Sequence, residues 1–379
     1  MSLHPEIQQA LTAAVGLPSY ADIPIAQARA LAKLAHPANP TPVPVGAVRD
    51  MSIPGPGGPI PARLYQPKAP PGAALLPALV YFHGSGFVVL DLDSHDDICR
   101  RLCAGAACVV LSVDYRLAPE HKFPAAPDDC LAATRWLAAQ ADALGIDASR
   151  IALAGDSAGA CLAAVTAQRI RDEGGPALCG QLLFYPVTDF PDTPAGSYIE
   201  CGQGYGLTRE RMLWFWEQYL AQPAQAVLPM ASPMRAPSLA GLPAACVLTA
   251  QYDVLRDEGH AYARRLREAG VHTLERCFEG MNHGFLKYCG AIDQADSAMN
   301  EACAWLRLAF AGAGPRPLGE CNAGADIRTQ KGDRSCAEVA EKTSVLLTSL
   351  SRLLRNLCDF CVRLSALIAF SIRVGGLAR

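Results

Sequence analysis

The pentapeptide 155–159, Gly-Asp-Ser-Ala-Gly, holds one serine between two glycines, a spacing typical of a catalytic nucleophile. Four apolar residues, Ile151–Ala154, precede it, and an apolar, alanine-rich segment, 160–170, follows it. This pattern predicts a strand, a sharp turn and a helix, which together form a nucleophile elbow. Glycines beside the serine leave room for the strained turn, and the helix points its positive N-terminus at the same place. We therefore expect Ser157 to act as a nucleophile.

A serine hydroxyl needs a base to activate it, and the base needs a carboxylate to orient it. Asp253 follows an apolar segment, 244–250, and His283 lies in a glycine-flanked loop after the segment 273–278. Both residues then stand at the carboxyl ends of predicted strands, where ligands bind in open sheets of this kind. The chain order of serine, acid and histidine also matches a hydrolase triad. The sequence predicts the triad Ser157, Asp253 and His283.

Other acids and bases are less well placed for this chemistry. Asp257 and Glu258 fall one turn beyond the predicted acid and are typical of first-turn charges that complement a helix N-terminus. His260 and His272 lie within or beside the predicted helix that follows. His83 precedes the serine, which is the wrong order for the base. We expect His83 to shape its own turn by hydrogen bonding.

An acyl-transfer serine also needs hydrogen-bond donors for the oxyanion of the tetrahedral intermediate. Ala158, the residue after the nucleophile, supplies one backbone N–H. The other donors should come from the loop after an upstream strand, and 83–86, His-Gly-Ser-Gly, follows the apolar segment 78–82 in that place. Small residues let backbone amides approach a substrate. We expect this loop to form the oxyanion hole, with His83 and Gly84 supporting it.

The elements that must position these residues alternate along the chain. Predicted strands occupy 47–53, 60–65, 78–82, 108–114, 151–154, 181–185, 244–250 and 273–278, and predicted helices occupy 93–107, 125–144, 160–170, 257–269 and 291–310. The first two strands are joined across Gly55-Pro-Gly-Gly58 as a hairpin. Strands that alternate with helices of this length indicate an α/β fold whose mostly parallel sheet is covered on both faces.

Two segments lie outside this alternation. Residues 1–45 carry two helical patterns, 5–15 and 25–34, and residues 190–240 contain the run Met212-Leu-Trp-Phe-Trp216 on a helix that Thr208 could cap. Three aromatic residues in a row point in several directions, so protein must surround this helix. Two interpretations stay open: a purely structural helix, or the roof of a hydrophobic binding site.

The composition excludes several classes of partner. The 379 residues carry a net charge of −3, and 51% are hydrophobic, so a nucleic-acid partner is not expected. No signal-peptide pattern opens the chain, and apolar runs in the main body fall short of the ~20 residues of a membrane span. The fifteen cysteines are dilute and lack zinc-ligand spacing, which indicates reduced thiols in the cytoplasm and no metal site.

The tail from residue 314 differs from the main body. Its first part is polar and unpatterned, and leucines then recur at helical spacing from Leu346 to Leu367 with arginines among them. A basic amphipathic helix of this kind could lie on a membrane or bind a partner. The alternative is a poorly ordered extension, and this second interpretation is preferred. Stable membrane insertion is not expected.

Taken together, these motifs resemble the bacterial hormone-sensitive lipase family of carboxylesterases, the family IV or GDSAG type. The resemblance rests on His83–Phe87, Asp114–Glu120, Phe123–Ala126, Gly155–Gly159, Asp253–Asp257 and His283–Phe285. It covers about residues 1–312 and implies the α/β-hydrolase fold with a helical cap.

The resemblance implies the same triad, Ser157, Asp253 and His283. The family's oxyanion motif is His-Gly-Gly-Gly, and its second and third glycines, which donate their amides, correspond to Ser85 and Gly86. Ser85 departs from the family pattern. Its Cβ could restrict the loop or crowd the acyl group, or its hydroxyl could add a polar contact.

The resemblance also implies a division of the chain. The cap comprises N-terminal helices, 1–45, and an insertion, 190–240. The core comprises residues 46–189 and 241–313. The extension 314–379 has no counterpart in the family.

The function implied is that of a serine carboxylic ester hydrolase that needs no cofactor or metal and acts on short- to medium-chain acyl esters. Side chains expected to line its apolar pocket are Phe87, Tyr205, Trp214 and Phe215. An amidase or deacetylase with the same triad is the alternative, followed by a non-catalytic binding protein on this fold. The expected partner is a small-molecule ester, and a homodimer is compatible with the sequence.

Overall fold

The computed structural model describes residues 2–68, 74–192 and 195–312. The chain divides into two units, residues 1–318 and 319–379, and the second lies outside the described residues. The predicted extension 314–379 therefore stays a prediction.

Eight strands form one sheet in the order β1-β2-β4-β3-β5-β6-β7-β8. Their bounds are β1 Ala47–Ile53, β2 Ile60–Gln66, β3 Leu76–Phe82, β4 Val109–Val113, β5 Ile146–Asp156, β6 Leu178–Phe184, β7 Ala245–Tyr252 and β8 Thr273–Asn282. The pairs β1–β2 and β2–β4 are antiparallel, and all other pairs are parallel. The predicted hairpin and the mostly parallel sheet are confirmed.

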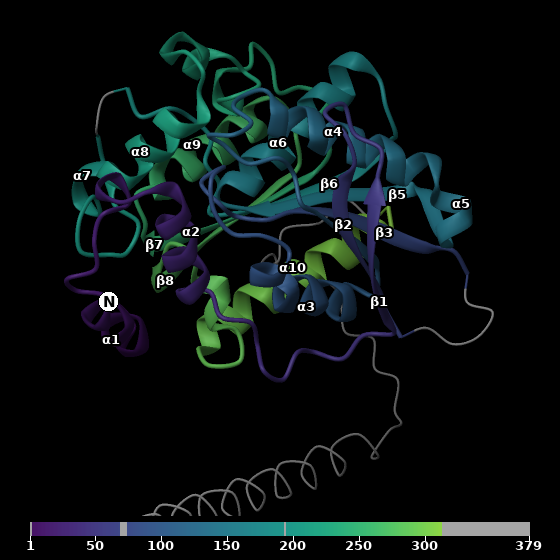
Figure 1. Cartoon of the computed structure of the whole chain (residues 1–379). Coiled ribbons are helices and arrows are strands. Elements are labelled where there is room, and N and C mark those ends of the chain that lie inside the picture. Colours follow the sequence, from purple (N-terminus) through teal and green to yellow (C-terminus); the bar gives the residue numbers. More distant parts are fainter. Residues whose placement is uncertain (1, 69–73, 193–194, 313–379) are drawn as a thin grey trace, which may run out of the picture. The chain divides into compact units, whose positions relative to one another are not determined.

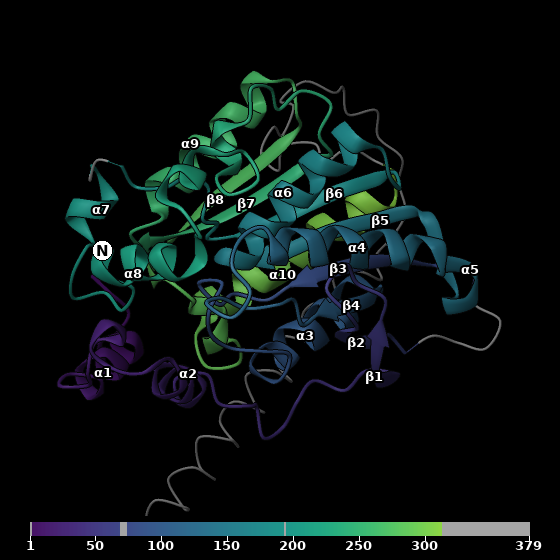
Figure 2. The same ribbon diagram turned by 45° about the horizontal axis from the view of Figure 1, so that its top comes forward.

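Helices cover both faces of the sheet (Figures 1 and 2). On one face lie α4 Ala125–Ala139, α6 Ala158–Glu173 and α9 Arg256–Glu268, and on the other lie α3 Asp96–Ala106 and α10 Asp293–Phe310. Alternate residues of β3 enter the two cores: Val80 packs with the first set and Leu79 with the second. A strand buried on both faces must be apolar throughout, which explains the unbroken apolar runs in the sequence.

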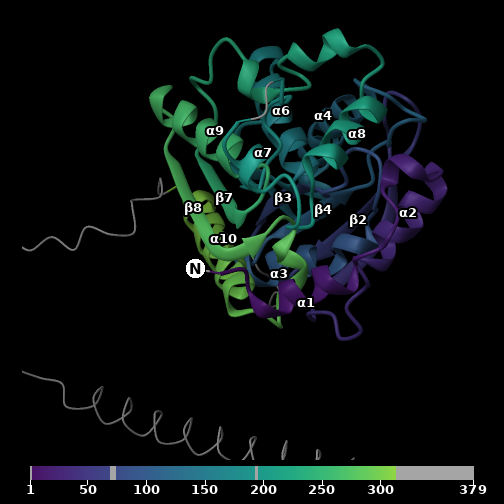
Figure 3. The same cartoon turned by 90° about the vertical axis from the view of Figure 1, so that its left-hand side faces the viewer.

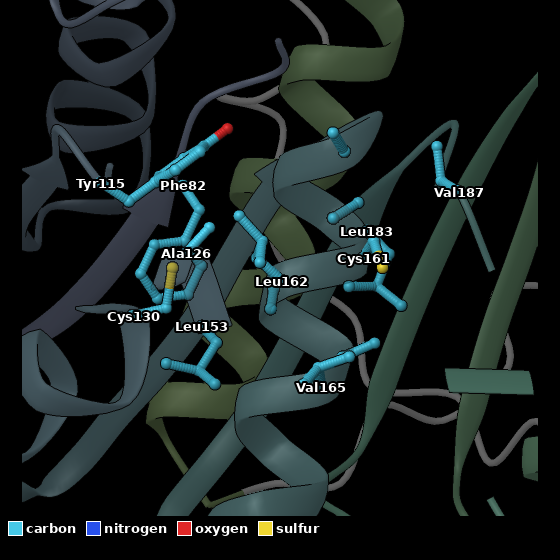
Figure 4. Packing of buried hydrophobic residues seen from close by; sticks show 14 of the residues in the cluster. Phe82, Tyr115, Ala126, Cys130, Leu153, Cys161, Leu162, Val165, Leu183 and Val187 are labelled. Atoms are coloured by element: carbon cyan, nitrogen blue, oxygen red, sulfur yellow. The ribbon is translucent and has the colours of Figure 1, made fainter. Parts of the chain in front are cut away.

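Helix α6 lies at the centre of the first core (Figure 4). Its Leu162 lies among Phe82, Leu153 and Cys130, which come from two strands and a neighbouring helix, and all four side chains are fully buried. Truncating such a side chain to alanine costs about 2–5 kcal/mol of stability. This packing fixes the N-terminus of α6, which follows Ser157 directly.

Two helix predictions were wrong in detail. The helix expected over 125–144 ends at Ala139, and a short helix, α5 Ala141–Leu144, follows. The break is at Gln140, whose backbone leaves the helical region and whose N–H bonds back to the last carbonyls of α4. The segment expected as one helix over 93–107 begins with a 3₁₀ turn, η2 Asp93–His95. No glycine or proline marks the Gln140 break, so the pattern gave no sign of it.

The N-terminal segment and the insertion contact each other (Figure 3). The first contains α1 Pro5–Ala13, η1 Tyr20–Asp22 and α2 Ile25–Leu34, and the second contains α7 Ser197–Glu200, α8 Arg209–Tyr219, η3 Pro223–Val227 and η4 Pro233–Arg235. The Tyr20 ring packs edge-on against Trp214 at 5.6 Å and Phe215 at 6.2 Å between ring centres. The predicted cap of α8 is confirmed, because the Thr208 hydroxyl accepts a hydrogen bond from the Arg211 amide.

Within the described ranges, no helix has both the length and the hydropathy to cross a membrane. The eleven cysteines of these ranges are all free, and eight of them are buried.

Candidate active site

Ser157 sits in a strained turn between β5 and α6, with φ 54° and ψ −121°. Positive φ is unusual for a residue with a side chain and is a common form of strain at functional sites. A Cβ at Gly155 would overlap the backbone of Gly159, and a Cβ at Gly159 would overlap the carbonyl of Phe82. Both glycines are therefore needed for the chain to pass this close to itself. The turn has the geometry expected of the elbow.

Ser157, His283 and Asp253 form a continuous chain of hydrogen bonds. The Ser157 Oγ lies 2.9 Å from His283 Nε2, and His283 Nδ1 lies 2.7 Å from Asp253 Oδ2. The other Asp253 oxygen accepts the Leu255 amide at 2.9 Å, which fixes the carboxylate in place. Since β7 and β8 end just before Asp253 and His283, the sheet edge brings the three residues together.

This arrangement selects one tautomer of the imidazole. With its Nδ1–H donated to the Asp253 carboxylate, His283 presents an unprotonated Nε2 to the Ser157 hydroxyl. Asp253 is 1% exposed and Ser157 is 7% exposed, so solvent screens the chain of hydrogen bonds only weakly. The Tyr185 ring meets the imidazole edge-on at 4.9 Å and limits its rotation.

The less favoured candidates lie elsewhere. Asp257 and Glu258 are in the first turn of α9, as expected, and accept the backbone amides of Ser197 and Thr188. His260 contacts Thr249 on β7 and Glu275 on β8, and His272 is exposed. Within the described part of the chain, no three Cys, His, Asp or Glu side chains are arranged to hold a metal ion.

The loop 83–87 lies against the elbow. The Gly84 amide donates to Asp156 Oδ1 at 2.7 Å, and Gly86 and Phe87 both have positive φ, 54° and 64°. Among the described residues, the backbone amides of Ser85, Gly86 and Ala158 donate to no acceptor. Ala158 opens helix α6, where amides have no partner within the helix. These three N–H groups are available to a negatively charged oxygen.

Comparisons with known proteins agree with this geometry. A family model described as alpha/beta hydrolase fold matches residues 79–287. Esterase LipI of Mycobacterium tuberculosis is 44% identical over 271 residues, which cover 70% of this chain and 83% of LipI. The chain belongs to the α/β-hydrolase family. Its relatives place it among the carboxylesterases of the hormone-sensitive lipase group.

Two further similarities support this membership. The ethyl acetate hydrolase of Pseudomonas putida is 41% identical over 246 residues, covering 64% of this chain and 76% of that protein. The structure of a hyperthermophilic esterase from the archaeon Pyrobaculum calidifontis superposes with a TM-score of 0.76 at 41% identity. That match covers 81% of this chain and 98% of the esterase. Both the family and the fold expected from the motifs are thus confirmed.

Asp156 is a central residue of this α/β-hydrolase that the sequence reasoning did not single out. Its buried carboxylate accepts Tyr81 Oη and the Gly84 amide, each at 2.7 Å, and pairs with His95 Nε2 at 3.3 Å. Burial raises its pKa, but the His95 charge and these hydrogen bonds outweigh burial and lower the pKa to about 2. The carboxylate therefore stays charged and ties the elbow to the loop. An acidic residue at the very end of a buried strand was the available signal.

The Ser85 side chain stabilises its own loop by hydrogen bonding. Its Oγ lies 2.6 Å from the Tyr115 hydroxyl and accepts the Phe87 amide at 2.8 Å. Tyr115 in turn donates to the His83 carbonyl at 2.6 Å. The sequence left open whether Ser85 restricts the loop, crowds the acyl group or adds a polar contact. The structure favours the polar contact, because the hydroxyl is hydrogen-bonded to Tyr115 and to the Phe87 amide.

His83 supports the loop mainly by packing. Its ring stacks on Tyr115 with centres 4.5 Å apart, and its Nδ1 lies 3.4 Å from the Gly84 carbonyl. Its Nε2 is buried and has no hydrogen-bond partner within the described residues. A Cβ at Gly84 would overlap the Asp156 carboxylate, so glycine is needed there for close approach.

The four side chains expected to line the pocket lie in different parts of the site. Phe87 is 2% exposed and stacks on Tyr219 at 3.8 Å, so insertion side chains cover its ring. Phe215 lies directly over the loop, because a Cβ at Gly86 would overlap its ring. Trp214 packs beside Phe215, with ring centres 5.3 Å apart.

Tyr205 lies near the other end of the site. Its ring stacks on Tyr252 at 4.9 Å, and its carbonyl accepts the side-chain amide of Asn282, the neighbour of His283. Phe215 therefore contacts the oxyanion loop, and Tyr205 contacts the loop of His283 through Asn282.

Glu258 is a second carboxylate that the pattern underestimated, and it is partly buried. It accepts the Thr188 amide at 2.6 Å and faces Tyr198, so it joins α9 to the start of the insertion. Burial is the main cause that raises its pKa, to about 8, against the opposing hydrogen bond from the Thr188 amide. Helix α9 begins three residues after Asp253, so this buried contact also anchors the loop of the acid.

Proposed function

We propose that this α/β-hydrolase cleaves carboxylic esters through an acyl-enzyme intermediate on Ser157. The observation that carries the proposal is the hydrogen-bond chain from Ser157 Oγ through His283 to Asp253, with links of 2.9 and 2.7 Å. A hydroxyl, an imidazole and a buried carboxylate in this order are the groups that acyl transfer requires.

In the acylation step, Ser157 Oγ attacks the ester carbonyl carbon while His283 Nε2 takes the hydroxyl proton. Asp253 stabilises the imidazolium that forms and keeps its ring oriented. The carbonyl oxygen becomes an oxyanion, and the amides of Ser85, Gly86 and Ala158 stabilise it. Each such donor contributes about 3 kcal/mol to catalysis in serine hydrolases.

Collapse of the tetrahedral intermediate releases the alcohol. His283 donates its proton to the leaving alkoxide, and the acyl group stays on Ser157 as an ester. The same imidazole then takes a proton from water, which attacks the acyl carbonyl, and a second collapse releases the carboxylic acid and restores the hydroxyl. No cofactor or metal enters these steps.

The substrates we propose are short- to medium-chain acyl esters. The support is the aromatic cover of the site, in which Phe215 and Trp214 lie on the oxyanion-loop side and Tyr205 on the histidine side. Apolar pockets with a few polar groups suit such molecules. We assign this cover to a cap made of residues 1–45 and 190–240, whose parts meet at Tyr20 and Trp214. The core then comprises residues 46–189 and 241–313.

We also propose the cytoplasm as the compartment and a homodimer as the assembly. The free state of all eleven described cysteines supports a reducing environment. The dimer is tested by light scattering on the purified full chain, where the mass of a monomer overturns it.

The test is hydrolysis of p-nitrophenyl esters from acetate to palmitate by the unaltered chain and by Ser157→Ala. We expect turnover that is highest for short and medium chains and that Ser157→Ala abolishes. Turnover that survives the substitution contradicts the mechanism, and absence of turnover in both proteins favours a binding protein. A parallel series of p-nitroanilides measures amidase activity, and faster cleavage of the anilides would replace the esterase assignment.

A further inference from the structure

Helix α2 of the N-terminal segment carries an arginine whose side chain reaches the residues just after the oxyanion loop. Arg29 Nε donates to the Val88 carbonyl at 2.9 Å, and its Nη2 donates to the Ala118 carbonyl at 3.1 Å. The Glu120 carboxylate accepts from both terminal nitrogens, at 2.8 and 2.6 Å. This two-pronged bond fixes the plane of the guanidinium, so the direction of its Nε–H is fixed as well.

A relay of hydrogen bonds leads from Arg29 to the oxyanion loop. The Val88 carbonyl shares a peptide unit with the Val89 amide, and this amide donates to the Ser85 carbonyl at 3.0 Å. The Ser85 carbonyl in turn shares a peptide unit with the Gly86 amide, which donates to no acceptor among the described residues. Because a peptide unit is planar, a bond to its carbonyl constrains the direction of its N–H. The relay therefore ends on an N–H group of the oxyanion hole.

A second set of bonds meets the relay at the same carbonyl. The Val88 amide also donates to the Ser85 carbonyl, at 3.1 Å. The Phe87 carbonyl, which shares a peptide unit with that amide, accepts the Ala118 amide at 2.9 Å. Arg29 holds Ala118 through its carbonyl. Both amides that orient the Ser85–Gly86 peptide unit are thus held, directly or through one residue, by the same guanidinium.

The relay also has an electrostatic direction. In each of its peptide units the carbonyl accepts a bond on one side and the N–H donates on the other, and hydrogen bonds in such a series polarise one another. A positively charged guanidinium stands at the start of the series. Its partner Glu120 is 53% exposed, so water screens the opposing negative charge. The last N–H is therefore a stronger donor to a charged oxygen.

We propose that Arg29 is a positioning residue for the oxyanion hole, which orients and polarises the Gly86 amide through the two intervening peptide units. This role rests on the proposed function, since it requires an oxyanion to form on the substrate that Ser157 attacks. The oxygen carries its full negative charge only after that attack. Loss of Arg29 should therefore lower kcat and leave KM nearly unchanged.

Lys33 offers a matched control on the same face of α2, one turn beyond Arg29. Its ammonium pairs with Asp91, which also follows the oxyanion loop. In the described part of the chain, that ammonium makes no hydrogen bond to residues 85–89. Lys33→Met thus removes an ion pair between the same helix and the same region without breaking the relay.

The first test compares hydrolysis of p-nitrophenyl butyrate by variants of the full chain, with active sites counted by phosphonate titration. We expect kcat to fall about tenfold in Arg29→Ala and about threefold in Arg29→Lys, which keeps the charge, with KM changed less than about twofold. Lys33→Met should stay within about twofold of the unaltered chain. Equal losses in Arg29→Ala and Lys33→Met overturn the proposal.

A pair of inhibitors separates positioning of the oxyanion hole from a general structural role. An alkyl trifluoromethyl ketone forms a tetrahedral adduct with a catalytic serine, and the adduct oxygen is charged. The matching methyl ketone binds as a neutral molecule. In Arg29→Ala the Ki of the trifluoromethyl ketone should rise by the factor by which kcat falls, about tenfold, and that of the methyl ketone should not change.

An unchanged ratio of the two Ki values in Arg29→Ala overturns the proposal. If Arg29→Ala does not fold, Arg29→Lys decides: a rise of about threefold in the ratio supports the role of Arg29, and no rise refutes it. Absence of ester hydrolysis in the unaltered chain refutes the proposed function itself. An active unaltered chain with unaffected Arg29 variants refutes only the role of Arg29.

Discussion

The Asp156 carboxylate and the Gly84 amide are joined by a hydrogen bond of 2.7 Å. Asp156 immediately precedes the serine, and Gly84 belongs to the loop expected to hold the oxyanion. One charged group therefore sets the spacing between the nucleophile turn and the amides that face it. A misplacement of 1 Å in such a site can cost a large factor in rate.

Replacing Asp156 by asparagine tests this link. Asparagine keeps the shape but removes the charge that pairs with His95, so a charge-assisted bond worth about 1.5–3 kcal/mol is lost. We expect kcat for p-nitrophenyl butyrate to fall about 10- to 100-fold and Tm to fall by several degrees. The control is Asp172→Asn, an exposed carboxylate paired with Arg171. Equal activity in the two variants contradicts the link.

Gly86→Ala should disable the loop. Its φ of 54° is strained for alanine, and the new Cβ would overlap the Phe215 ring. We expect kcat/KM to fall about 100-fold or more, the loss typical of a displaced oxyanion donor. The double variant Gly86→Ala/Phe215→Ala removes the overlap and should recover part of the loss. If the double variant is no more active than Gly86→Ala, Phe215 does not lie where the structure places it.

Ser85→Ala should affect stability more than substrate choice. The substitution leaves the Phe87 amide and the Tyr115 hydroxyl without their shared partner, which costs about 1–3 kcal/mol in urea unfolding. Tyr115→Phe removes the same contact from the other side and should lose a similar amount. The ratio of acetate to hexanoate hydrolysis should not change. A shift in that ratio at unchanged stability would show that the side chain faces the acyl group.

Glu258 predicts a dependence of stability on pH. Its pKa is about 8 in the folded chain and near 4.5 when exposed, so between these values the folded state binds more protons than the unfolded state. Stability from this group is therefore full below about pH 4.5 and is lost as pH rises to about 8, by up to ~1.4 kcal/mol per pH unit. Glu258→Gln should flatten the slope, measured by urea unfolding across this range. Glu268→Gln, an exposed residue of the same helix, is the control, and equal slopes in the two variants rule out the assignment.

Much of the fold followed from the sequence because its inner strands are largely apolar runs and its other elements are bounded by turn residues. The strand 47–53 and the helix 25–34 have the bounds that the pattern predicted. The break at Gln140 escaped prediction because no breaker residue marks it and the apolar spacing continues past it. Ser157, Asp253 and His283 could be predicted because each follows a strand. The order serine, acid, histidine along the chain then distinguished them from the other acids and histidines.

What the sequence could not provide was contacts between distant segments. Asp156 bonds to Tyr81 and Gly84, more than seventy residues away, and no local spacing encodes that. Glu258 has the position of an ordinary first-turn charge, but it accepts the amide of Thr188, which lies 70 residues earlier in the chain. The direction of the Ser85 hydroxyl depends on Tyr115, which lies thirty residues later in the chain and bonds to it.

The most direct measurement is the site of covalent labelling by a p-nitrophenyl phosphonate ester, a mimic of the tetrahedral intermediate. Trypsin releases Ser157 in peptide 151–169, so mass spectrometry can locate the adduct. We expect one phosphonyl group per chain on Ser157, loss of ester hydrolysis in step with labelling, and much slower labelling of His283→Ala. An adduct on another residue, or hydrolysis that persists in fully labelled protein, contradicts it.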